Sequence, residues 1–183
     1  MTGAVGRVRA LVRYPLKSAD GEALEAVAVT ATGLEDDRRW ALRSATGEPV
    51  TAKEVPALRG VRARSVGGHL VVEPADALTD LVGDDVQVED SPGGHQQVAA
   101  VHLASHGAVS APDAPTGCDP EPRANLVLDL AEPGAERGWV GRRVRIGGAV
   151  LEVTREPQRC LGVYCSVVEA GAVRVGDEVL LEG

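Results

Sequence analysis

The sequence predicts a mainly β protein with few short helices, and three features of the chain lead to this prediction. Hydrophobic residues make up 44% of the 183 residues, yet aromatic residues make up only 2% and phenylalanine is absent. Valine, leucine and alanine must therefore fill the core, and valine favours strands because its branched side chain packs well on a pleated surface. Short apolar runs also recur between turn-forming residues, which is typical of antiparallel barrels and sandwiches.

In the N-terminal half, apolar runs bounded by turn residues predict a series of strands. Gly67 and Gly68 separate two of these runs by only two residues, which predicts a tight hairpin. The stretch Pro74–Gly94 is acidic and rich in turn residues, so we expect one short edge strand between loops there. The strands expected in this half are Gly6–Tyr14, Glu25–Thr30, Arg38–Arg43, Gly60–Val66, His69–Glu73 and Asp85–Glu89.

In the C-terminal half, Val101–Val109 predicts the end of a strand and a short helix, and the proline-rich stretch Ala111–Pro122 predicts an irregular loop. Gly147 and Gly148 again separate two apolar runs as in a hairpin. We expect two β-barrel-like lobes, residues 1–95 and residues 96–183. The strands expected in this half are Asn125–Asp129, Arg142–Ile146, Ala149–Thr154, Val163–Val168, Ala172–Val175 and Glu178–Leu181.

Charge and composition exclude several classes of function. The formal net charge is −8, which argues against nucleic acid as a partner because phosphate backbones attract a basic face. Any anion site must be local, and only Lys17 and Lys53 are lysines. No apolar run reaches 18 residues and no signal-peptide pattern begins the chain, so we expect a cytoplasmic protein without a membrane partner. In that compartment the three cysteines are expected to be thiols.

Two parts of the sequence resemble one known family. Arg13–Gly21 (RYPLKSADG), Thr32–Trp40 (TGLEDDRRW) and Pro49–Leu58 (PVTAKEVPAL) resemble the N-terminal β-barrel domain that precedes MOSC domains, which are named after the C-terminus of molybdenum cofactor sulfurase. The second half is similar to the core and end of the MOSC domain itself. Its matching stretches are Arg123–Leu128, Trp139–Ile146, Pro157–Cys160, Leu161–Tyr164 and Val173–Val179.

The resemblance implies a two-lobed β fold that holds molybdopterin, with a cysteine sulfur as the ligand of molybdenum. Family members include the mitochondrial amidoxime-reducing component and bacterial relatives that reduce N-hydroxylated compounds. We therefore expect an oxidoreductase that acts on a small-molecule substrate. Because three scattered cysteines cannot hold an iron–sulfur cluster, electrons should come from a separate donor protein.

The family pattern marks Cys160 as the metal ligand and catalytic residue. A thiolate is a soft donor, and Arg159 beside it would favour the deprotonated sulfur. The chain is a shortened form: larger relatives carry a segment between this cysteine and the Leu-Gly-Val-Tyr motif, whereas here Cys160 adjoins Leu161 directly. Cys165 is the alternative ligand, although its place in an apolar strand favours a buried packing role.

The resemblance also implies cofactor-binding roles for residues in both lobes. Lys17, Ser18 and Arg38 match positions that contact the pterin or its phosphate, and Arg123 and Asn125 match positions that hold the polar edge of the pterin. We expect these side chains to converge on one cleft.

Each assignment has an alternative from the residues alone. Lys17 could be a solvated surface charge, and Arg38 could form an exposed ion pair with Glu35 or Asp36. Arg39 would point to the other face of an extended segment. Arg123 could pair with Asp119 or Glu121, with Asn125 ending a turn.

Other functions remain open at this stage. The chain could be a carrier or binding module that presents the cofactor or activated sulfur without turnover, or a metal-free interaction domain. A zinc site built from His102, His106 and the cysteines is less favoured, because the tight Cys-x-x-Cys spacing is missing. A serine hydrolase is disfavoured too, since no Gly-x-Ser-x-Gly motif occurs.

Overall fold

The computed structural model describes residues 3–95, 98–111, 123–158 and 160–182, which belong to two compact units. Unit 1 comprises Met1–Val12, Ala23–Glu35 and Val98–Gly183, and unit 2 comprises Arg13–Glu22 and Asp36–Gln97. The units therefore interleave along the chain and do not follow the contiguous lobes 1–95 and 96–183 that the sequence suggested. The reason is that the first strand pairs with strands from the end of the chain.

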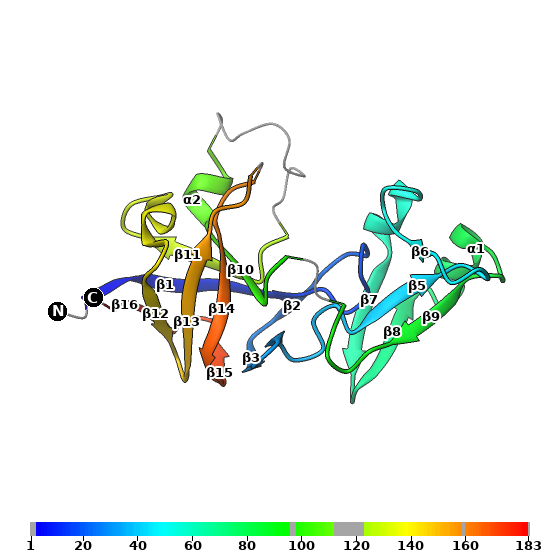
Figure 1. The fold of residues 1–183 in the computed structure, drawn as a ribbon, viewed down its shortest axis with the longest axis horizontal. Coiled ribbons are helices and arrows are strands. Elements are labelled where there is room, and N and C mark those ends of the chain that lie inside the picture. The colour runs from blue at the N-terminus through cyan, green and yellow to red at the C-terminus, as the bar shows by residue number, and fades with distance from the viewer. Residues whose placement is uncertain (1–2, 96–97, 112–122, 159, 183) are drawn as a thin grey trace. The chain divides into compact units, whose positions relative to one another are not determined.

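Unit 1 is built on a closed β-barrel (Figure 1). In the described part of the chain, seven strands follow one another around it in the order β11, β10, β14, β13, β12, β16, β1, and the pairing of β11 with β1 closes the ring. The short β2 (Glu22–Leu24) extends the sheet beside β1. The barrel strands are β1 (Gly3–Arg13), β10 (Val101–Ser105), β11 (Leu126–Leu130), β12 (Arg143–Ile146), β13 (Ala149–Arg155), β14 (Val163–Glu169) and β16 (Glu178–Leu181).

The barrel core is aliphatic, as the composition predicted. Inward-facing valine, leucine and isoleucine side chains are almost wholly buried, and Trp139 is the one aromatic ring in this described cluster. The hairpin expected at Gly147 and Gly148 joins β12 to β13, and Gly147 has a φ of 54°. Only glycine adopts that conformation without strain.

Short elements surround the barrel. The strands β3 (Ala26–Thr30), β4 (Gly33–Leu34) and β15 (Gly171–Arg174) form a three-stranded sheet in the order β15, β3, β4. The helix α2 (His106–Val109) follows β10 directly, and the 3-10 helix η2 (Ala135–Trp139) follows β11. The mainly β prediction with few short helices is confirmed, although no pattern in the sequence predicted η2.

A buried acid connects these elements. Glu136 in η2 is fully buried, and its Oε1 accepts a hydrogen bond from the Ser105 backbone N–H at 3.0 Å. Ser105 Oγ accepts the Gly134 N–H at 2.8 Å. Glu136 Oε2 has no hydrogen-bond partner among the residues that the structure describes. The carboxyl group therefore fixes the start of α2 with one oxygen only.

The described part of unit 2 contains two small sheets and two short helices. The strands β5 (Trp40–Arg43), β6 (Pro49–Val50) and β9 (Gln87–Asp90) form a sheet with β5 in the centre, and β7 (Arg62–Val66) pairs with β8 (His69–Glu73). Gly67 and Gly68 join β7 to β8 with φ angles of 57° and 77°, as the hairpin prediction requires. The helices are η1 (Pro56–Gly60) and α1 (Ala77–Val82).

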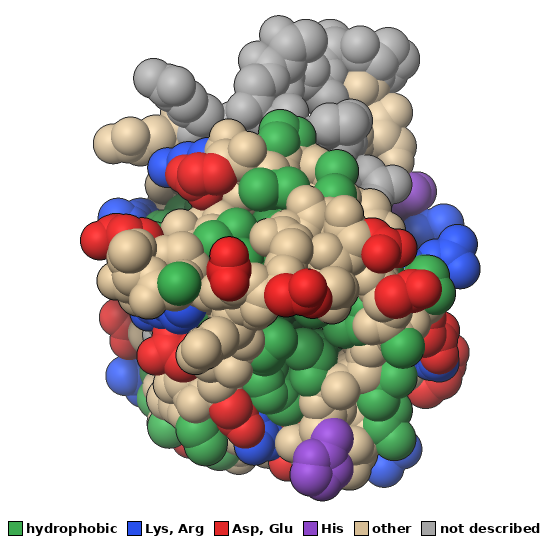
Figure 2. All heavy atoms as spheres, turned by 90° about the vertical axis from the view of Figure 1, so that its right-hand side faces the viewer, with side chains coloured by type: hydrophobic (Ala, Val, Ile, Leu, Met, Phe, Trp, Pro, Cys, Tyr) green, Lys and Arg blue, Asp and Glu red, His purple; other side chains and the backbone are tan. Residues whose placement is uncertain are grey.

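The core of unit 2 is smaller and more open than the barrel core. Leu16, Trp40, Leu42 and Leu58 are buried in its centre. Many of the apolar residues packed against this centre are only partly buried. Figure 2, which views the side of the molecule that carries unit 2, shows hydrophobic side chains gathered on the surface and bordered by acidic groups.

Candidate functional site

The segment after β1 places Lys17 on the surface of unit 2. Leu16 and Ala19 are fully buried, and the Lys17 N–H donates to the Trp40 carbonyl oxygen at 2.8 Å. Ser18 has a φ of 73°, in the left-handed region that residues other than glycine rarely adopt. The backbone therefore holds Lys17 and Ser18 in a fixed and locally strained turn beside β5.

Arg38 lies in a second turn of the same kind. Its φ is 51°, and its backbone N–H donates to the Tyr14 carbonyl oxygen at 2.7 Å. Its Nη1 donates to Asp37 Oδ2 at 2.6 Å, and its guanidinium carbon lies 5.5 Å from the centre of the Tyr14 ring. Asp37 Oδ1 accepts the Tyr14 N–H at 2.8 Å. Asp37, whose side chain is 5% exposed, therefore fixes the position of Arg38.

The predicted alternatives for Arg38 and Arg39 need correction in one respect. The ion pair that Arg38 forms is with Asp37, not with Glu35 or Asp36. Arg39 does turn elsewhere, but the cause is the turn at Arg38 and not strand alternation, because β5 begins only at Trp40. Arg39 binds Asp90 at 2.7 Å and Asp36 at 3.1 Å, and these bonds raise the pKa of Arg39.

Lys17 lies in a locally positive environment. Burial lowers the pKa of Lys17, and the nearby charges of Arg43, Arg38 and Lys53 lower it further. Within the described ranges no ion pair or side-chain hydrogen bond is found for the Lys17 ammonium group. An ammonium group that is close to three cations and has no acidic partner is suited to an anion from outside.

Arg43 and Lys53 belong to this cluster, and sequence reasoning missed both. Arg43 ends β5 and binds Glu89 Oε2 through its Nε at 2.6 Å. Lys53 lies just after β6, which pairs with β5. For Lys53 the sequence did contain a signal, since this residue falls in the stretch Pro49–Leu58 that resembles the family and is the second of two lysines. We call Lys17, Arg38, Arg43 and Lys53 the cation cluster.

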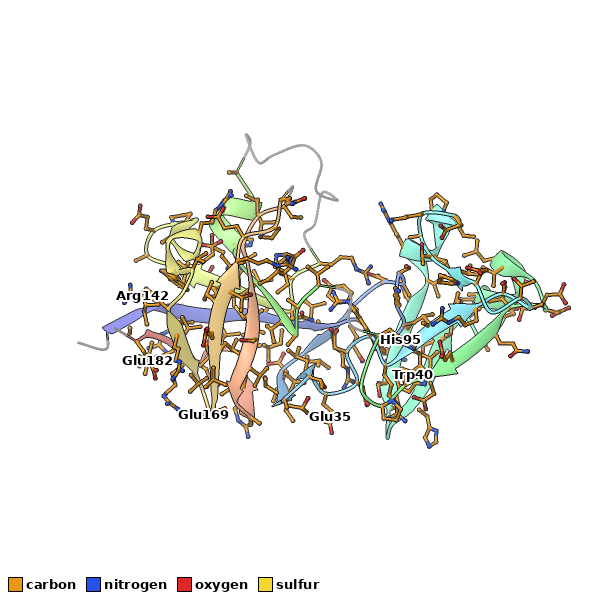
Figure 3. All side chains as sticks on the ribbon, viewed as in Figure 1. Glu35, Trp40, His95, Arg142, Glu169 and Glu182 are labelled. Carbon is orange, nitrogen blue, oxygen red and sulfur yellow. The ribbon has the colours of Figure 1, made fainter. Side chains whose placement is uncertain are left out.

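His95 lies on the segment after β9 and contacts the backbone of Arg38. Its N–H donates to the Arg38 carbonyl oxygen at 2.7 Å, and its Nε2 is 3.9 Å from Glu89 Oε2. That nitrogen is buried and has no hydrogen-bond partner in the described part of the chain. Figure 3 shows the side chains of His95 and Trp40 on neighbouring segments of unit 2.

In unit 1, Asn125 is a structural amide. It is fully buried, its Oδ1 accepts the His102 N–H at 3.1 Å, and its Nδ2 donates to the Val12 carbonyl oxygen at 3.3 Å. Its own backbone binds the same two residues. The side chain thus joins β10 to β1, and its buried polar atoms already have partners, which weakens the predicted contact with a pterin.

Arg123 precedes Asn125 in an irregular segment. Both residues lie before β11, which begins at Leu126, one residue after the start that the sequence predicted. Arg123 is half-buried and has a partner. Arg159, the predicted neighbour of the metal ligand, lies outside the described residues.

The two described cysteines differ in state. Cys160 is disulfide-bonded, so the expectation that it is a thiol is wrong in this structure. Cys165 in β14 is a free thiol with 1% exposure, as predicted, and burial raises its pKa to about 12. Cys118 lies outside the described residues. Among those residues no group of three or more potential metal-binding side chains gathers, which gives the zinc hypothesis no support.

The segment that carries Cys160 is fixed against β10. The carbonyl oxygen of its neighbour Leu161 lies 2.8 Å from His102 Nε2, whose ring packs on Tyr164 at 5.0 Å. Gly162 has a φ of 80°, and a Cβ atom there would lie 2.2 Å from the Leu103 carbonyl oxygen. The Leu-Gly-Val-Tyr motif therefore needs glycine for close passage along β10.

The predicted site residues thus form two sets. Lys17, Ser18 and Arg38 lie in unit 2, whereas Arg123, Asn125 and Cys160 lie in unit 1. The convergence of both sets on one cleft stays a prediction.

A family comparison agrees with the sequence motifs. Residues 5–114 match the family model described as the MOSC N-terminal beta barrel domain. The chain belongs to the MOSC-domain family. Membership indicates a function related to the molybdenum cofactor.

Similar proteins support the MOSC assignment. The chain is 49% identical over 43 residues to molybdenum cofactor sulfurase of Solanum lycopersicum and 36% identical over 55 residues to that of Oryza sativa subsp. japonica. These matches cover 24% and 30% of this chain but only 5% and 7% of the two plant proteins. The chain therefore spans only a small part of the length of these plant proteins.

One solved structure shares the fold of this chain over almost its whole length. The YuaD protein from Bacillus subtilis is similar with a TM-score of 0.50 and 14% identity, over 99% of this chain and 96% of that one. YiiM from Geobacillus stearothermophilus has a TM-score of 0.38 and 15% identity, over 67% and 71%. At this identity the YuaD match shows the fold alone. Among the described residues, no helix has the length and apolar character needed to cross a membrane.

Proposed function

We propose that this MOSC protein binds molybdopterin and, with the metal bound, acts as an oxidoreductase on N-hydroxylated or related small molecules. The observation that carries the proposal is Lys17, which has no acidic partner in the described structure and lies close to three other cations in a chain of net charge −8. In such a chain, an unneutralised cluster is suited to a ligand with a phosphate group.

The residues of unit 2 fit the phosphate end of the cofactor. Lys17 supplies a point charge, the hydroxyl of Ser18 can donate a hydrogen bond, and Arg38 supplies a planar donor group held by Asp37. Ser18 and Arg38 both have positive φ angles, a strain of order 1–3 kcal/mol that tends to occur at functional sites. These residues would bind and orient the phosphate before any chemistry takes place.

The metal end requires a change in Cys160. A disulfide sulfur carries no proton and no negative charge, so it must first be reduced. A cellular dithiol would supply two electrons and two protons: the protein disulfide becomes two thiols as the dithiol becomes a disulfide. Cys160 could then lose its proton and offer a soft thiolate to molybdenum. When bound, the cofactor supplies a metal centre for two-electron transfer of an oxygen atom.

We propose a small-molecule substrate and a separate electron-donor protein, because the chain has too few cysteines for an iron–sulfur cluster of its own. His102 and Gly162 hold the segment beside Cys160 against β10, which would keep the ligand sulfur in place during turnover.

The test is to produce the protein in a host that makes the cofactor, treat it with a dithiol and measure bound molybdenum and pterin. We expect Lys17→Gln to lose both, and Cys160→Ser to lose molybdenum and the reduction of an N-hydroxylated compound by an artificial electron donor. Arg62→Gln, an exposed change elsewhere in unit 2, is the control for charge and should keep both. If the wild type retains no more cofactor than Lys17→Gln, the proposal is wrong.

A second function is a carrier or binding module without turnover. The disulfide at Cys160 favours it, because an oxidised sulfur offers no thiolate to a metal. In that case the wild type and Cys160→Ser would retain equal amounts of pterin, and neither would reduce the substrate. Lys17→Gln would still lose the pterin, which separates this function from a metal-free interaction domain.

A further inference from the structure

The strand β9 lies at the edge of its sheet and is exposed along its whole length. Among the described residues it pairs only with β5, and all four of its residues are exposed. Val88 is 47% exposed, although it lies opposite the buried Leu42 of β5. An edge strand of this kind presents unpaired backbone groups to an extended segment that approaches it.

The register of β9 shows which of its backbone groups are unpaired. The Ser91 N–H donates to the Arg39 carbonyl oxygen at 2.9 Å, just beyond the end of the ladder between β5 and β9. Bonded and non-bonded pairs alternate along an antiparallel ladder, so Glu89 bonds to β5, whereas Val88 and Asp90 do not. The N–H and C=O groups of Val88 and Asp90 therefore point away from β5, and no backbone partner is found for them in the described part of the chain.

The segment that leads into β9 is strongly acidic. Residues 73–90 include seven carboxylates and no lysine or arginine. Arginines of other segments pair with Glu73, Glu89 and Asp90. Unit 2 as a whole has thirteen aspartate and glutamate residues against nine lysine and arginine residues, so its acidic excess is concentrated here. Four carboxylates of this segment form no ion pair with a described residue, and they are Asp76, Asp80, Asp84 and Asp85.

Apolar side chains accompany the free edge. Val86, directly before β9, packs on the core of unit 2 but is only partly buried. Val88 lies two residues further on, hence on the same face of the extended segment, and is not part of this core. Figure 2 shows hydrophobic side chains on this side of the molecule with acidic groups around them. An added strand with apolar side chains on this face would cover both valines.

We propose that β9 is a docking site for an extended segment of a partner protein in which apolar residues alternate with lysine or arginine. The segment joins the sheet as an antiparallel strand next to β9. Its apolar side chains lie on the face of Val88, and its basic side chains are attracted by the acidic segment before β9. The inference goes beyond the proposed function and does not depend on it, because no cofactor takes part.

The charges argue against a second copy of this chain as the occupant. Antiparallel pairing of β9 with β9 of another copy would bring two acidic segments together, and like charges in a strand pair are destabilising. Natural edge strands use charged side chains in this way to avoid pairing with themselves. The same acids favour a basic partner.

The test uses the full chain and two capped hexapeptides, KVKVKV and EVEVEV. Both alternate valine with a charged residue, and they differ only in the sign of the charge. We expect KVKVKV to bind at least about tenfold more tightly than EVEVEV, as measured by NMR titration of the ¹⁵N-labelled protein. In hydrogen exchange, KVKVKV should protect the amides of Val88 and Asp90. The Glu89 amide should change little, because it already bonds to β5.

N-methylated peptides separate backbone pairing from simple charge attraction. In the antiparallel arrangement, the peptide residues opposite Val88 and Asp90 turn their N–H groups toward β9, and these residues are the valines. Methylation of the valine nitrogens should abolish binding, whereas methylation of the lysine nitrogens should change the affinity less than about threefold. The two methylated peptides have the same charge and composition. If they bind equally, whether strongly or weakly, the proposal is wrong.

Val88→Pro tests the same hydrogen bond from the side of the protein. Because the Val88 N–H does not bond to β5, this edge position should accept proline. We expect KVKVKV to bind at least about fivefold more weakly, since the donor is lost. Val88→Thr keeps the N–H and the branched side chain, so as the matched control it should change the affinity less than about twofold.

Thermal unfolding checks that both variants fold. A folded Val88→Pro variant that binds KVKVKV as tightly as Val88→Thr would overturn the proposal. Should Val88→Pro fail to fold, the comparison of the two methylated peptides on the unchanged chain decides the question.

Discussion

The two units use their polar residues in opposite ways. In unit 1, Asn125, His102 and Glu136 are buried inside or against the barrel, and their hydrogen bonds connect strands and helices. In unit 2, Lys17 and the cations around it remain at the surface, and Lys17 and Lys53 form no ion pair among the described residues. The closed barrel therefore serves as the stable scaffold of the chain, and unit 2 offers the groups that can bind an anion.

The largest expected effect tests the stability of the barrel. Leu128→Ala removes a fully buried side chain from a closed core and should cost about 2–5 kcal/mol in the free energy of unfolding. Leu70→Ala in unit 2 removes a partly buried side chain and should cost clearly less. Urea denaturation measures both. Equal losses would contradict the comparison, because the open core of unit 2 would then be as tightly packed as the barrel.

The second effect tests whether Asn125 is structural. Asn125→Ala leaves the His102 N–H and the Val12 carbonyl oxygen without their side-chain partner, at a cost of about 1–3 kcal/mol for each buried group. Binding of methyl phosphate should not change, because Asn125 belongs to unit 1. A variant of normal stability that loses bound pterin would instead support the direct contact implied by the family resemblance.

The third effect concerns the buried oxygen of Glu136 that has no partner in the described structure. Glu136→Gln keeps the acceptor for the Ser105 N–H and removes the charge, so the variant should be at least as stable as the wild type near neutral pH. Glu136→Ala should lower the free energy of unfolding by about 1–3 kcal/mol, since the Ser105 N–H then has no hydrogen-bond acceptor. A clear loss of stability in Glu136→Gln would show that the negative charge is needed.

The smallest effect tests the strain in unit 2. Ser18→Gly relieves a φ of 73° and should raise stability by about 1 kcal/mol or less. The same change removes the hydroxyl group next to Lys17 of the cation cluster, so methyl phosphate should bind more weakly. Ala45→Gly, on an exposed loop, is the matched control and should leave the affinity unchanged. A Ser18→Gly variant that is less stable would show that the backbone at Ser18 is not strained.

Most of the fold could be predicted because its signals are local. Alternating valines and paired glycines placed β7, β8, β12 and β13 close to their observed bounds. The helix α1 was missed because its stretch is acidic and turn-rich, and its leucines form a helix only when they pack on the core of unit 2. The closure of the barrel by β1 and β11 was equally hidden, since strand pairing over such a distance in sequence leaves no local pattern.

The residues of the site could be predicted only where they belong to a family motif. Lys17, Ser18 and Arg38 came from the family resemblance, and the structure adds the strain and the electrostatic environment that composition could not show. Lys53 was visible as a rare residue type, but its relation to Lys17 depends on the pairing of β5 with β6. The side-chain hydrogen bonds of Asn125 and the oxidised state of Cys160 depend on neighbouring residues that sequence spacing does not reveal.

The pairing of β1 with β16 has a consequence for the order in which the chain folds during synthesis. All residues of unit 2 are synthesised before β10, whereas β1 must wait for Glu178–Leu181 before its last partner exists. Domains generally fold as units while translation proceeds from the N-terminus. Unit 2 can therefore fold first, while β1 still lacks its partners β11 and β16. For most of translation, the nascent chain exposes the strand edge that a chaperone or a second copy would recognise.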